Sequence, residues 1–272
     1  MLGGPIAGAI LGTHWLNTPG WRWLFLFEGI PAILLGAVTV FVLPDRPKDA
    51  RWLRPEERDW MTARLAEEHR AKAHTEKMSI LQALRHPAVL VLTAGLFFTY
   101  TGGYAFWFWF PTMLQRLTGW TDVQRIGWVG AIPFIAGLIG MLVLGSSSDR
   151  MGERRWHFAI PQLTAALALV VWFFIPHSNL LLIAVFTLVG FGTVAYLPSF
   201  WALPSAFLTS SAAAAAVGFI NCTASIGGFV GPKIIGELSQ RTSSFNIGFI
   251  FMIACFIIAS LLVLLCPREK IQ

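Results

Sequence analysis

The chain has 272 residues, of which 56% are hydrophobic and only 12% are charged, and its formal net charge is +6. Soluble domains carry about 25% charged residues, so this composition argues against an ordinary soluble fold. The basic excess is not a nucleic-acid-binding stripe, because ten of the twenty Lys and Arg residues lie in residues 44–87 beside eight of the fourteen acids, as in a solvated loop.

Long apolar segments occupy most of the chain. Those with at most one charged residue are 23–43, 88–115, 126–148, 157–176, 180–200, 211–232 and 244–266. A bilayer core of roughly 30 Å needs about 20 apolar helical residues, so each segment is long enough to span it. Residues 1–16 form an eighth, shorter segment of about 24 Å at about 1.5 Å per residue. Because backbone groups in lipid must bond to one another, we expect an all-α membrane bundle of about eight transmembrane helices.

The charges of the connecting loops predict how the chain crosses the membrane. Taken alternately, the connections fall into two sets. The first set holds 15 Lys and Arg residues and comprises 44–87, 149–156, 201–212 and 267–272, whereas the second set holds five. Since Lys and Arg are enriched in cytoplasmic loops, we expect the first set and both termini to lie in the cytoplasm.

A charged motif follows the apolar segment 126–148. It reads Gly-Ser-Ser-Ser-Asp-Arg-Met-Gly-Glu-Arg-Arg, and its candidate gate residues are Gly145, Asp149, Arg150, Gly152, Arg154 and Arg155. Gly152 can supply the positive φ that a tight turn between antiparallel helices needs. The acid and the arginines would form a charge cluster that holds in one conformation and breaks in another. On spacing alone, a conformational gate and a simple topology signal are equally good interpretations.

This motif resembles the cytoplasmic loop motif of the major facilitator superfamily, G-x-x-x-D-R-x-G followed by basic residues. Residues 148–157, Ser-Asp-Arg-Met-Gly-Glu-Arg-Arg-Trp-His, are similar to the anion:cation symporter branch, which carries tartrate, phthalate and sugar acids. Further similarities lie in residues 21–31, 43–47, 53–58 and 108–111. The resemblance implies a twelve-helix fold built from two six-helix halves.

In that family a long cytoplasmic loop follows the sixth helix, whereas here it follows the second apolar segment. The resemblance therefore implies three parts. Residues 1–43 would be two helices remaining from the N-terminal bundle, the first of them truncated; residues 44–87 would be the cytoplasmic linker; and residues 88–272 would be the C-terminal six-helix bundle. The first four helices would be absent, which leaves a separate N-terminal half as a conceivable partner. Within the linker, residues 53–65 suit a helix with Pro55 in its first turn.

Few ionised groups lie within the apolar segments, although an organic anion in the membrane needs cations or hydrogen-bond donors to replace its water. Glu28 is either a proton site or a polar anchor near Arg22, and the anchor is favoured. Lys233 is near the end of its segment, so its ammonium is expected to extend to the interface. Neither residue is expected to form an anion site.

Polar and aromatic residues are the better candidates for substrate binding. Tyr100 and Tyr104 share a helix face at i, i+4. The resemblance places Ser199, Trp201 and Asn221 at positions that contact substrate in related symporters. Two alternatives remain open, since the tyrosines can instead bond across the bundle and Asn221 can instead join two helices.

The function expected from these features is secondary active transport of a small organic anion across the lipid bilayer of a bacterial inner membrane, coupled to a proton or another cation. The alternative is a transport-inactive remnant or a scaffold that packs with another chain. Neither H-E-x-x-H, G-x-S-x-G nor C-x-x-C occurs, so the sequence indicates no enzyme, cofactor or metal.

Overall fold

A computed structural model describes residues 3–11, 15, 18–73, 80–176, 178–207 and 210–266. Within these ranges every regular element is a helix, which confirms the expected all-α fold. The chain divides into two compact units, one of residues 6–77 and one of residues 78–272 together with residues 1–5. Each unit is described by itself.

The smaller unit is dominated by two long helices. Its elements are most of α1 (Gly3–Leu11), then α2 (Gly20–Val42), the short η2 (Pro47–Asp49) and α3 (Pro55–Ala73). The first and last parts of the predicted segment 1–16 lie outside the described residues, apart from Trp15. The backbone carbonyl of Trp15 accepts a hydrogen bond from Trp23 Nε1 at 3.0 Å. α3 begins at Pro55, as predicted, and the side chain of Glu57 accepts a bond from the Arg54 backbone N–H at 3.0 Å.

The larger unit is a bundle of helices packed along their lengths. Its elements are α4 (Ile80–Leu84), α5 (Pro87–Thr118), α6 (Val123–Met151), α7 (Arg155–Trp172), α8 (Asn179–Ala195), α9 (Leu197–Phe207), α10 (Ser210–Thr242) and α11 (Asn246–Leu264). α8 and α9 form one bent span that is interrupted at Tyr196.

Six stretches of the described chain are helical, long and apolar enough to cross a membrane, namely α2, α5, α6, α8 with the start of α9, α10 and α11. α7 has 18 residues, or about 27 Å, close to the thickness of a bilayer core. It packs between α8 and α11, two helices that are part of stretches long and apolar enough to cross. A polytopic membrane bundle is thereby confirmed.

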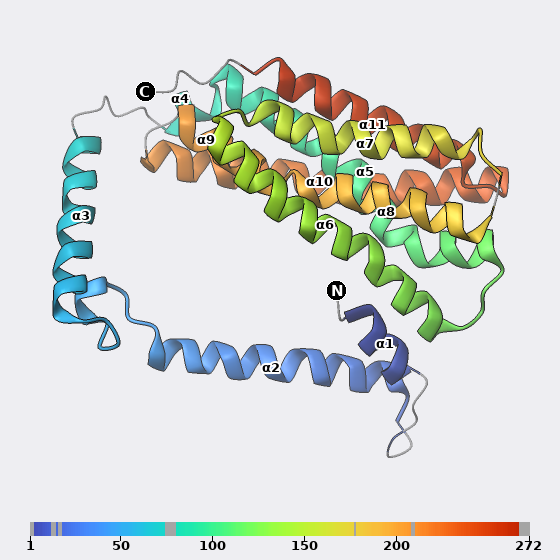
Figure 1. Cartoon of the computed structure of the whole chain (residues 1–272), viewed down its shortest axis with the longest axis horizontal. Helices are drawn as coiled ribbons and strands as arrows, with labels where there is room; N and C mark the ends of the chain where they lie inside the picture. Colours follow the sequence, from blue (N-terminus) through green and yellow to red (C-terminus); the bar gives the residue numbers. More distant parts are fainter. Residues whose placement is uncertain are drawn as a thin grey trace. The chain divides into compact units, whose positions relative to one another are not determined.

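The spatial order of the helices differs from their order along the chain. α5 packs against α10 and α11, α7 joins α11 to α8, and α8 in turn packs against α6 (Figure 1). The resulting sequence of neighbours is α10, α5, α11, α7, α8 and α6. The most extensive contact is between α5 and α10, two helices that are far apart along the chain.

Local signals explain where the helices begin and end. The Asp122 carboxylate caps α6 by accepting bonds from the backbone N–H groups of Gln124 and Arg125, at 2.9 and 3.3 Å. Gly119 ends α5 with φ 73° and Gly152 ends α6 with φ 61°, both in the left-handed region. The positive φ predicted for Gly152 is therefore confirmed.

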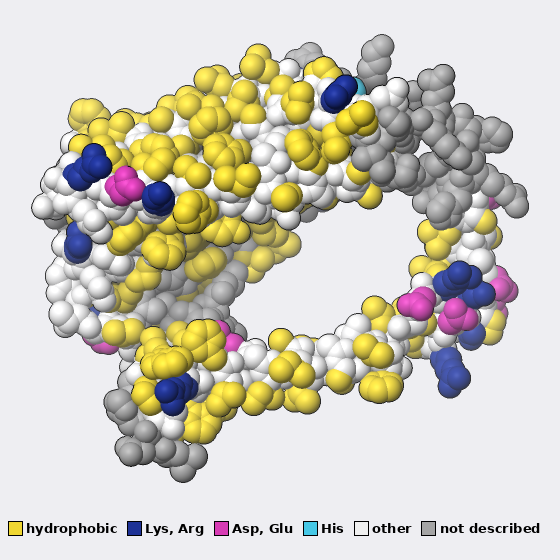
Figure 2. Space-filling model, turned by 180° about the vertical axis from the view of Figure 1, so that it is seen from behind, with side chains coloured by type: hydrophobic (Ala, Val, Ile, Leu, Met, Phe, Trp, Pro, Cys, Tyr) yellow, Lys and Arg dark blue, Asp and Glu magenta, His cyan; other side chains and the backbone are white. Residues whose placement is uncertain are grey.

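The outer surface of the bundle is as apolar as its interior. Phe174 is 83% exposed and Leu265 is 75% exposed. Figure 2 shows hydrophobic side chains over most of one face of the bundle, with charged side chains gathered toward its ends. A soluble protein rarely exposes apolar surface on this scale, whereas lipid covers it without cost.

Glycines allow the closest helix contacts. A Cβ placed on Gly227 would lie 2.5 Å from the Phe97 carbonyl oxygen, and one on Gly231 would collide with the backbone of Thr101. These two glycines, four residues apart on α10, bring its backbone against that of α5 as small residues do in membrane helices. No larger residue fits at either position without separating the helices.

Replacing Gly231 with Ala is expected to destabilise the bundle, because the new methyl group must push α10 away from α5. Overpacking of this kind costs about 1–3 kcal/mol. The thermal unfolding midpoint of the purified chain in detergent measures the effect. Gly218→Ala is the matched control on the same helix, since nothing lies within 4 Å of the position that its new methyl group would take. Equal midpoints for the two variants would contradict the packing role of Gly231.

Candidate functional site

A hydrogen bond between side chains joins the two most closely packed helices. The Tyr100 hydroxyl on α5 donates to Asn221 Oδ1 on α10 at 3.2 Å. The ring of Tyr104 lies edge to face with that of Tyr100, with centroids 5.3 Å apart. The structure thus brings together Tyr100, Tyr104 and Asn221, three of the five predicted substrate contacts.

This cluster is open on one side. Tyr104 is 52% exposed and Asn221 is also exposed. Gly228 leaves room for the Tyr104 ring, which would lie 3.4 Å from a Cβ at that position. Among the described residues, the Asn221 amide nitrogen donates no hydrogen bond. The cluster therefore presents unused donors on an accessible surface, and it also joins two helices.

The other two predicted contacts are less accessible. Ser199 is 1% exposed, and its hydroxyl is buried without a hydrogen-bond partner in the described structure. Trp201 is half-buried, with its ring 5.3 Å from that of Phe200. Their contact with substrate stays a prediction.

Tyr196 is a further residue beside the cluster that the sequence did not single out. It is buried at the junction of α8 and α9, where it interrupts the span, and it belongs to the hydrophobic core cluster against which Tyr100 packs. The signal that could have located it is Pro198, two residues later, because proline disturbs a helix just before itself.

The arginines of the loop between α6 and α7 bond to backbone carbonyls of other helices, and Arg155 does so at the end of α11. Arg154 Nη1 donates to the Ala202 carbonyl on α9 at 2.7 Å. Arg155 Nη1 donates to the carbonyls of Cys266 and Leu264, at 2.8 and 3.4 Å, where α11 ends. Carbonyls at a helix C-terminus lack intrahelical partners and carry partial negative charge, so a guanidinium stabilises them.

The acid at the centre of this loop is Glu153 and not Asp149. Glu153 accepts a bond from the Trp156 backbone N–H at 2.7 Å and forms an ion pair with Arg155 at 3.6 Å. It also lies 3.7 Å from His157, whose other ring nitrogen is 3.0 Å from the Ser147 hydroxyl. The expected cluster of Asp149 with the arginines is therefore replaced by one around Glu153.

Asp149 and Arg150 are exposed at the end of α6. Neither has a side-chain hydrogen bond or ion pair within the described residues. Gly145 lies one turn earlier, where a Cβ would be 3.3 Å from Pro198 of α9. Gly145 thus allows the close approach of α6 to α9. The Asp149 carboxylate remains available to a partner that the described residues do not provide. Their gating role stays a prediction.

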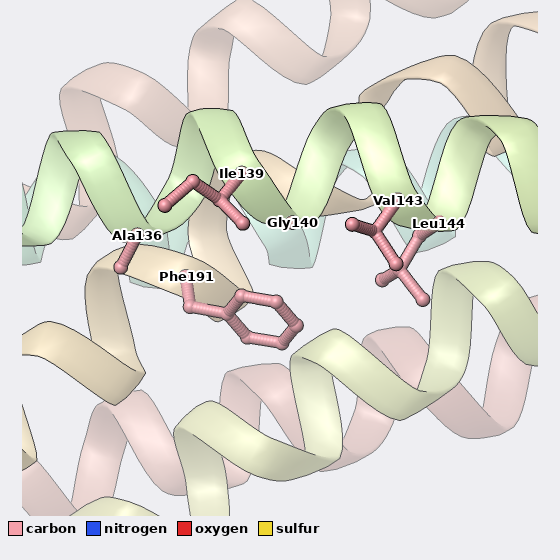
Figure 3. A pocket seen from close by; sticks show the side chains of 6 residues that line it. All are labelled: Ala136, Ile139, Gly140, Val143, Leu144 and Phe191. Carbon is pink, nitrogen blue, oxygen red and sulfur yellow. The ribbon is translucent and has the colours of Figure 1, made fainter.

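The remaining candidates give less support for a binding site. Glu28 is exposed on α2, and no ion pair joins it to Arg22, whose guanidinium lies 5.3 Å from the Trp21 ring, in the described part of the chain. A pocket of about 370 Å³ between α6 and α8 is lined only by apolar side chains, including Ile139 and Phe191 (Figure 3). It has no donor for an anion. No group of His, Cys, Asp and Glu in the described residues could hold a metal ion.

Comparison with known proteins settles the family. The family model of the Major Facilitator Superfamily matches residues 1–232. This chain belongs to the Major Facilitator Superfamily. As a superfamily member with several apolar spanning helices, it is an integral, multi-pass membrane protein.

Similar superfamily proteins cover this chain almost completely. A putative tartrate transporter of Agrobacterium vitis is 35% identical over 99% of the chain and 60% of its own length. A quinolone resistance transporter of Acinetobacter baumannii is 34% identical over 93% of the chain and 58% of its own. A putative metabolite transport protein of Pseudomonas putida is 32% identical over 100% and 62%. The chain therefore spans about 60% of the length of these relatives.

Arg155→Gln is expected to loosen the end of α11, because it removes a guanidinium bonded to two terminal carbonyls. Hydrogen bonds to charged groups contribute about 1.5–3 kcal/mol. Hydrogen–deuterium exchange should accelerate in the last turn of α11. Arg150→Gln is the matched control, since this arginine is exposed in the last turn of α6, next to the loop, and binds nothing in the described structure. Identical exchange in both variants would refute the assignment.

Proposed function

We propose that this chain takes part in secondary active transport of a small organic anion, a carboxylate or sugar acid, by alternating access. The observation that carries the proposal is the accessible cluster of Tyr100, Tyr104 and Asn221, with an unused amide donor, between two closely packed spans of a superfamily member. Two putative tartrate transporters among the relatives support the choice of an organic anion.

The chemistry of the cluster suits a hydroxylated anion. Phenol and amide groups both donate and accept hydrogen bonds, so they match the hydroxyls of a sugar acid or hydroxy acid as well as a carboxylate oxygen. Ligand sites are commonly apolar clefts with a few polar groups that fix the orientation of the ligand. The two tyrosine rings, edge to face with each other, provide the apolar wall, and the Asn221 amide provides the orienting group.

Coupling and orientation are part of the same proposal. Transport against a gradient requires a co-transported proton or another cation, and Glu28 is the candidate proton site of the smaller unit, with a role as polar anchor as its alternative. The distribution of Lys and Arg supports a bacterial inner-membrane location with both termini and the loop between α6 and α7 in the cytoplasm.

A second candidate function is a membrane protein that does not transport and only packs with another chain, such as a separate N-terminal half. The Tyr100–Asn221 hydrogen bond, which can simply join two spans, is compatible with it. Both candidates require the same helices. Only transport requires the donors of the cluster to meet a solute.

Uptake by the reconstituted chain separates these candidates. Proteoliposomes with an inward proton gradient should accumulate radiolabelled tartrate saturably, and Asn221→Ala should raise the apparent KM about tenfold or abolish uptake, because a lost hydrogen bond with desolvation of its partner costs about 1–3 kcal/mol. Ser225→Ala is the control one turn away, since its hydroxyl already bonds to the Asn221 carbonyl at 2.8 Å. Retention no greater than in empty liposomes, for tartrate and other small carboxylates, would favour the non-transporting candidate.

Asp149→Asn is expected to slow the transport cycle and leave substrate binding nearly unchanged. The exposed carboxylate has no partner in the described conformation, so its proposed partner forms only in another one. The measurement compares the turnover rate with the equilibrium Kd. Asp122→Asn makes the same chemical change at the other end of α6, where Asn still caps the helix. Wild-type turnover in Asp149→Asn would remove this residue from the gate.

A further inference from the structure

Two pockets follow one another along α6. The apolar pocket of about 370 Å³ is lined by Ile139 and Val143 of α6 and by Phe191 of α8 (Figure 3). A second pocket, of about 480 Å³, is lined by Val143, Ser146 and Arg150 among others. Because Val143 lines both, the two pockets adjoin and run from apolar side chains to a guanidinium. We call them together the α6 groove.

Six of the lining residues share one face of α6. At 3.6 residues per turn they fall within about 100° of arc, and they are Ala136, Ile139, Val143, Ser146, Ser147 and Arg150. Phe134 stacks on Trp107 of α5, with ring centroids 3.9 Å apart. It precedes Val143 by nine residues, or two and a half turns, so the two side chains leave the helix in opposite directions. The α6 groove therefore lies on the side of α6 that is turned away from α5 and from the proposed substrate cluster.

The length of the α6 groove matches one leaflet of a bilayer. Ile139 and Arg150 are eleven residues apart, or about 16 Å along the helix, and half of a bilayer core is about 15 Å. The 29 residues of α6 make it about 43 Å long, so a helix centred in the bilayer extends about 7 Å beyond the core at each end. Arg150, in the last turn, then lies among the lipid headgroups, and Ile139 lies near the middle of the bilayer.

Arg150 is the charged residue that lines the α6 groove, and its guanidinium binds nothing within the described residues. The hydroxyls beside it are already engaged. Ser146 donates to a carbonyl of its own helix at 2.8 Å, and the Ser147 hydroxyl lies 3.0 Å from His157 Nε2. Asp149 is exposed next to Arg150 but does not line the groove. The groove thus presents one unpaired cation at the end of an apolar surface.

An anionic phospholipid fits both parts of this groove. A guanidinium binds phosphate oxygens through two parallel charge-assisted hydrogen bonds, and an acyl chain covers exposed apolar side chains such as Ile139 and Val143. Basic pockets at the ends of membrane helices are typical binding sites of anionic headgroups. A soluble phosphate leaves the apolar part uncovered. A zwitterionic lipid brings an ammonium group toward Arg150, and the nearby acid Glu153 is already paired with Arg155.

We propose that the α6 groove binds an anionic phospholipid, with its phosphate on Arg150 and one acyl chain extending past Val143 to Phe191. The site is separate from the cluster of Tyr100 and Asn221, and the proposal does not depend on transport. The lipid would lie against the end of α6, the helix that continues into the loop between α6 and α7.

Equilibrium binding of radiolabelled phosphatidylglycerol to the purified full-length chain in detergent micelles tests the headgroup contact, with a scintillation proximity assay as the measurement. Arg150→Gln should raise the Kd at least fivefold and reduce its dependence on salt, because it removes the charge. Arg150→Lys should retain binding within about threefold. Arg125→Gln is the matched control and should bind as the wild type does, since it makes the same change at the other end of α6, where the guanidinium lies 3.7 Å from the Trp120 ring.

A second pair of variants tests the acyl-chain contact. Val143→Trp fills the junction of the two pockets and should also raise the Kd for phosphatidylglycerol at least fivefold. Leu138→Trp adds the same ring at an exposed position that lines neither pocket, so it should bind as the wild type does. Both substitutions are on the exposed surface of α6, and equal thermal unfolding midpoints show that both variants are folded.

Each outcome decides for or against the site. A wild-type Kd in Arg150→Gln or in Val143→Trp overturns it. Phosphatidylethanolamine with the same acyl chains, bound as tightly as phosphatidylglycerol, overturns the choice of an anionic headgroup. Displacement of the lipid by equimolar glycerol 3-phosphate shows a soluble phosphate ligand and overturns the lipid. Loss of phosphatidylglycerol binding in both variants, with binding retained in Arg150→Lys, supports the site. All of these outcomes leave the proposed transport function standing.

Discussion

The structure depends on one constraint, that backbone N–H and C=O groups in hydrocarbon must bond to one another. Long stretches without charge can meet this condition only as helices, and accordingly every regular element in the described part of the bundle is a helix. With apolar side chains inside and outside, burial in lipid gives no preference for one helix face over another. Close packing must therefore select the arrangement, and Gly227 and Gly231 do so by bringing the backbones of α10 and α5 together.

The same constraint makes unpaired polar groups informative. Most hydroxyls on the spans bond to a carbonyl one turn earlier on their own helix, as Thr93 does to Val89 at 2.7 Å and Thr101 to Phe97 at 2.7 Å. Such groups have little left to offer a solute. Asn221 and Tyr104 differ because they are exposed and retain hydrogen-bond donors. In an apolar frame, such groups are the candidates for contact with a polar solute.

The loop between α6 and α7 follows a related logic at one end of the bundle. The carbonyls at the end of α11 lack intrahelical partners, and Arg155 bonds to them, while Arg154 bonds to the Ala202 carbonyl within α9. Glu153 positions Arg155 and accepts a bond from the start of α7. A single short loop thereby connects four helices. Asp149 lies outside this network in the described part of the chain, and its gating role stays a prediction.

The sequence by itself determined the helical class, the membrane location and the turn at Gly152, because these follow from local composition and from the conformational freedom of glycine. It also placed Tyr100 and Tyr104 on one face, since helical periodicity is a local property. Only the tertiary structure decided that Tyr100 bonds to Asn221, 121 residues away, and that Arg154 and Arg155 bond to carbonyls of α9 and of the end of α11. These features depend on which helices are neighbours and on side-chain direction. In lipid, hydrophobic periodicity no longer encodes which helices are neighbours.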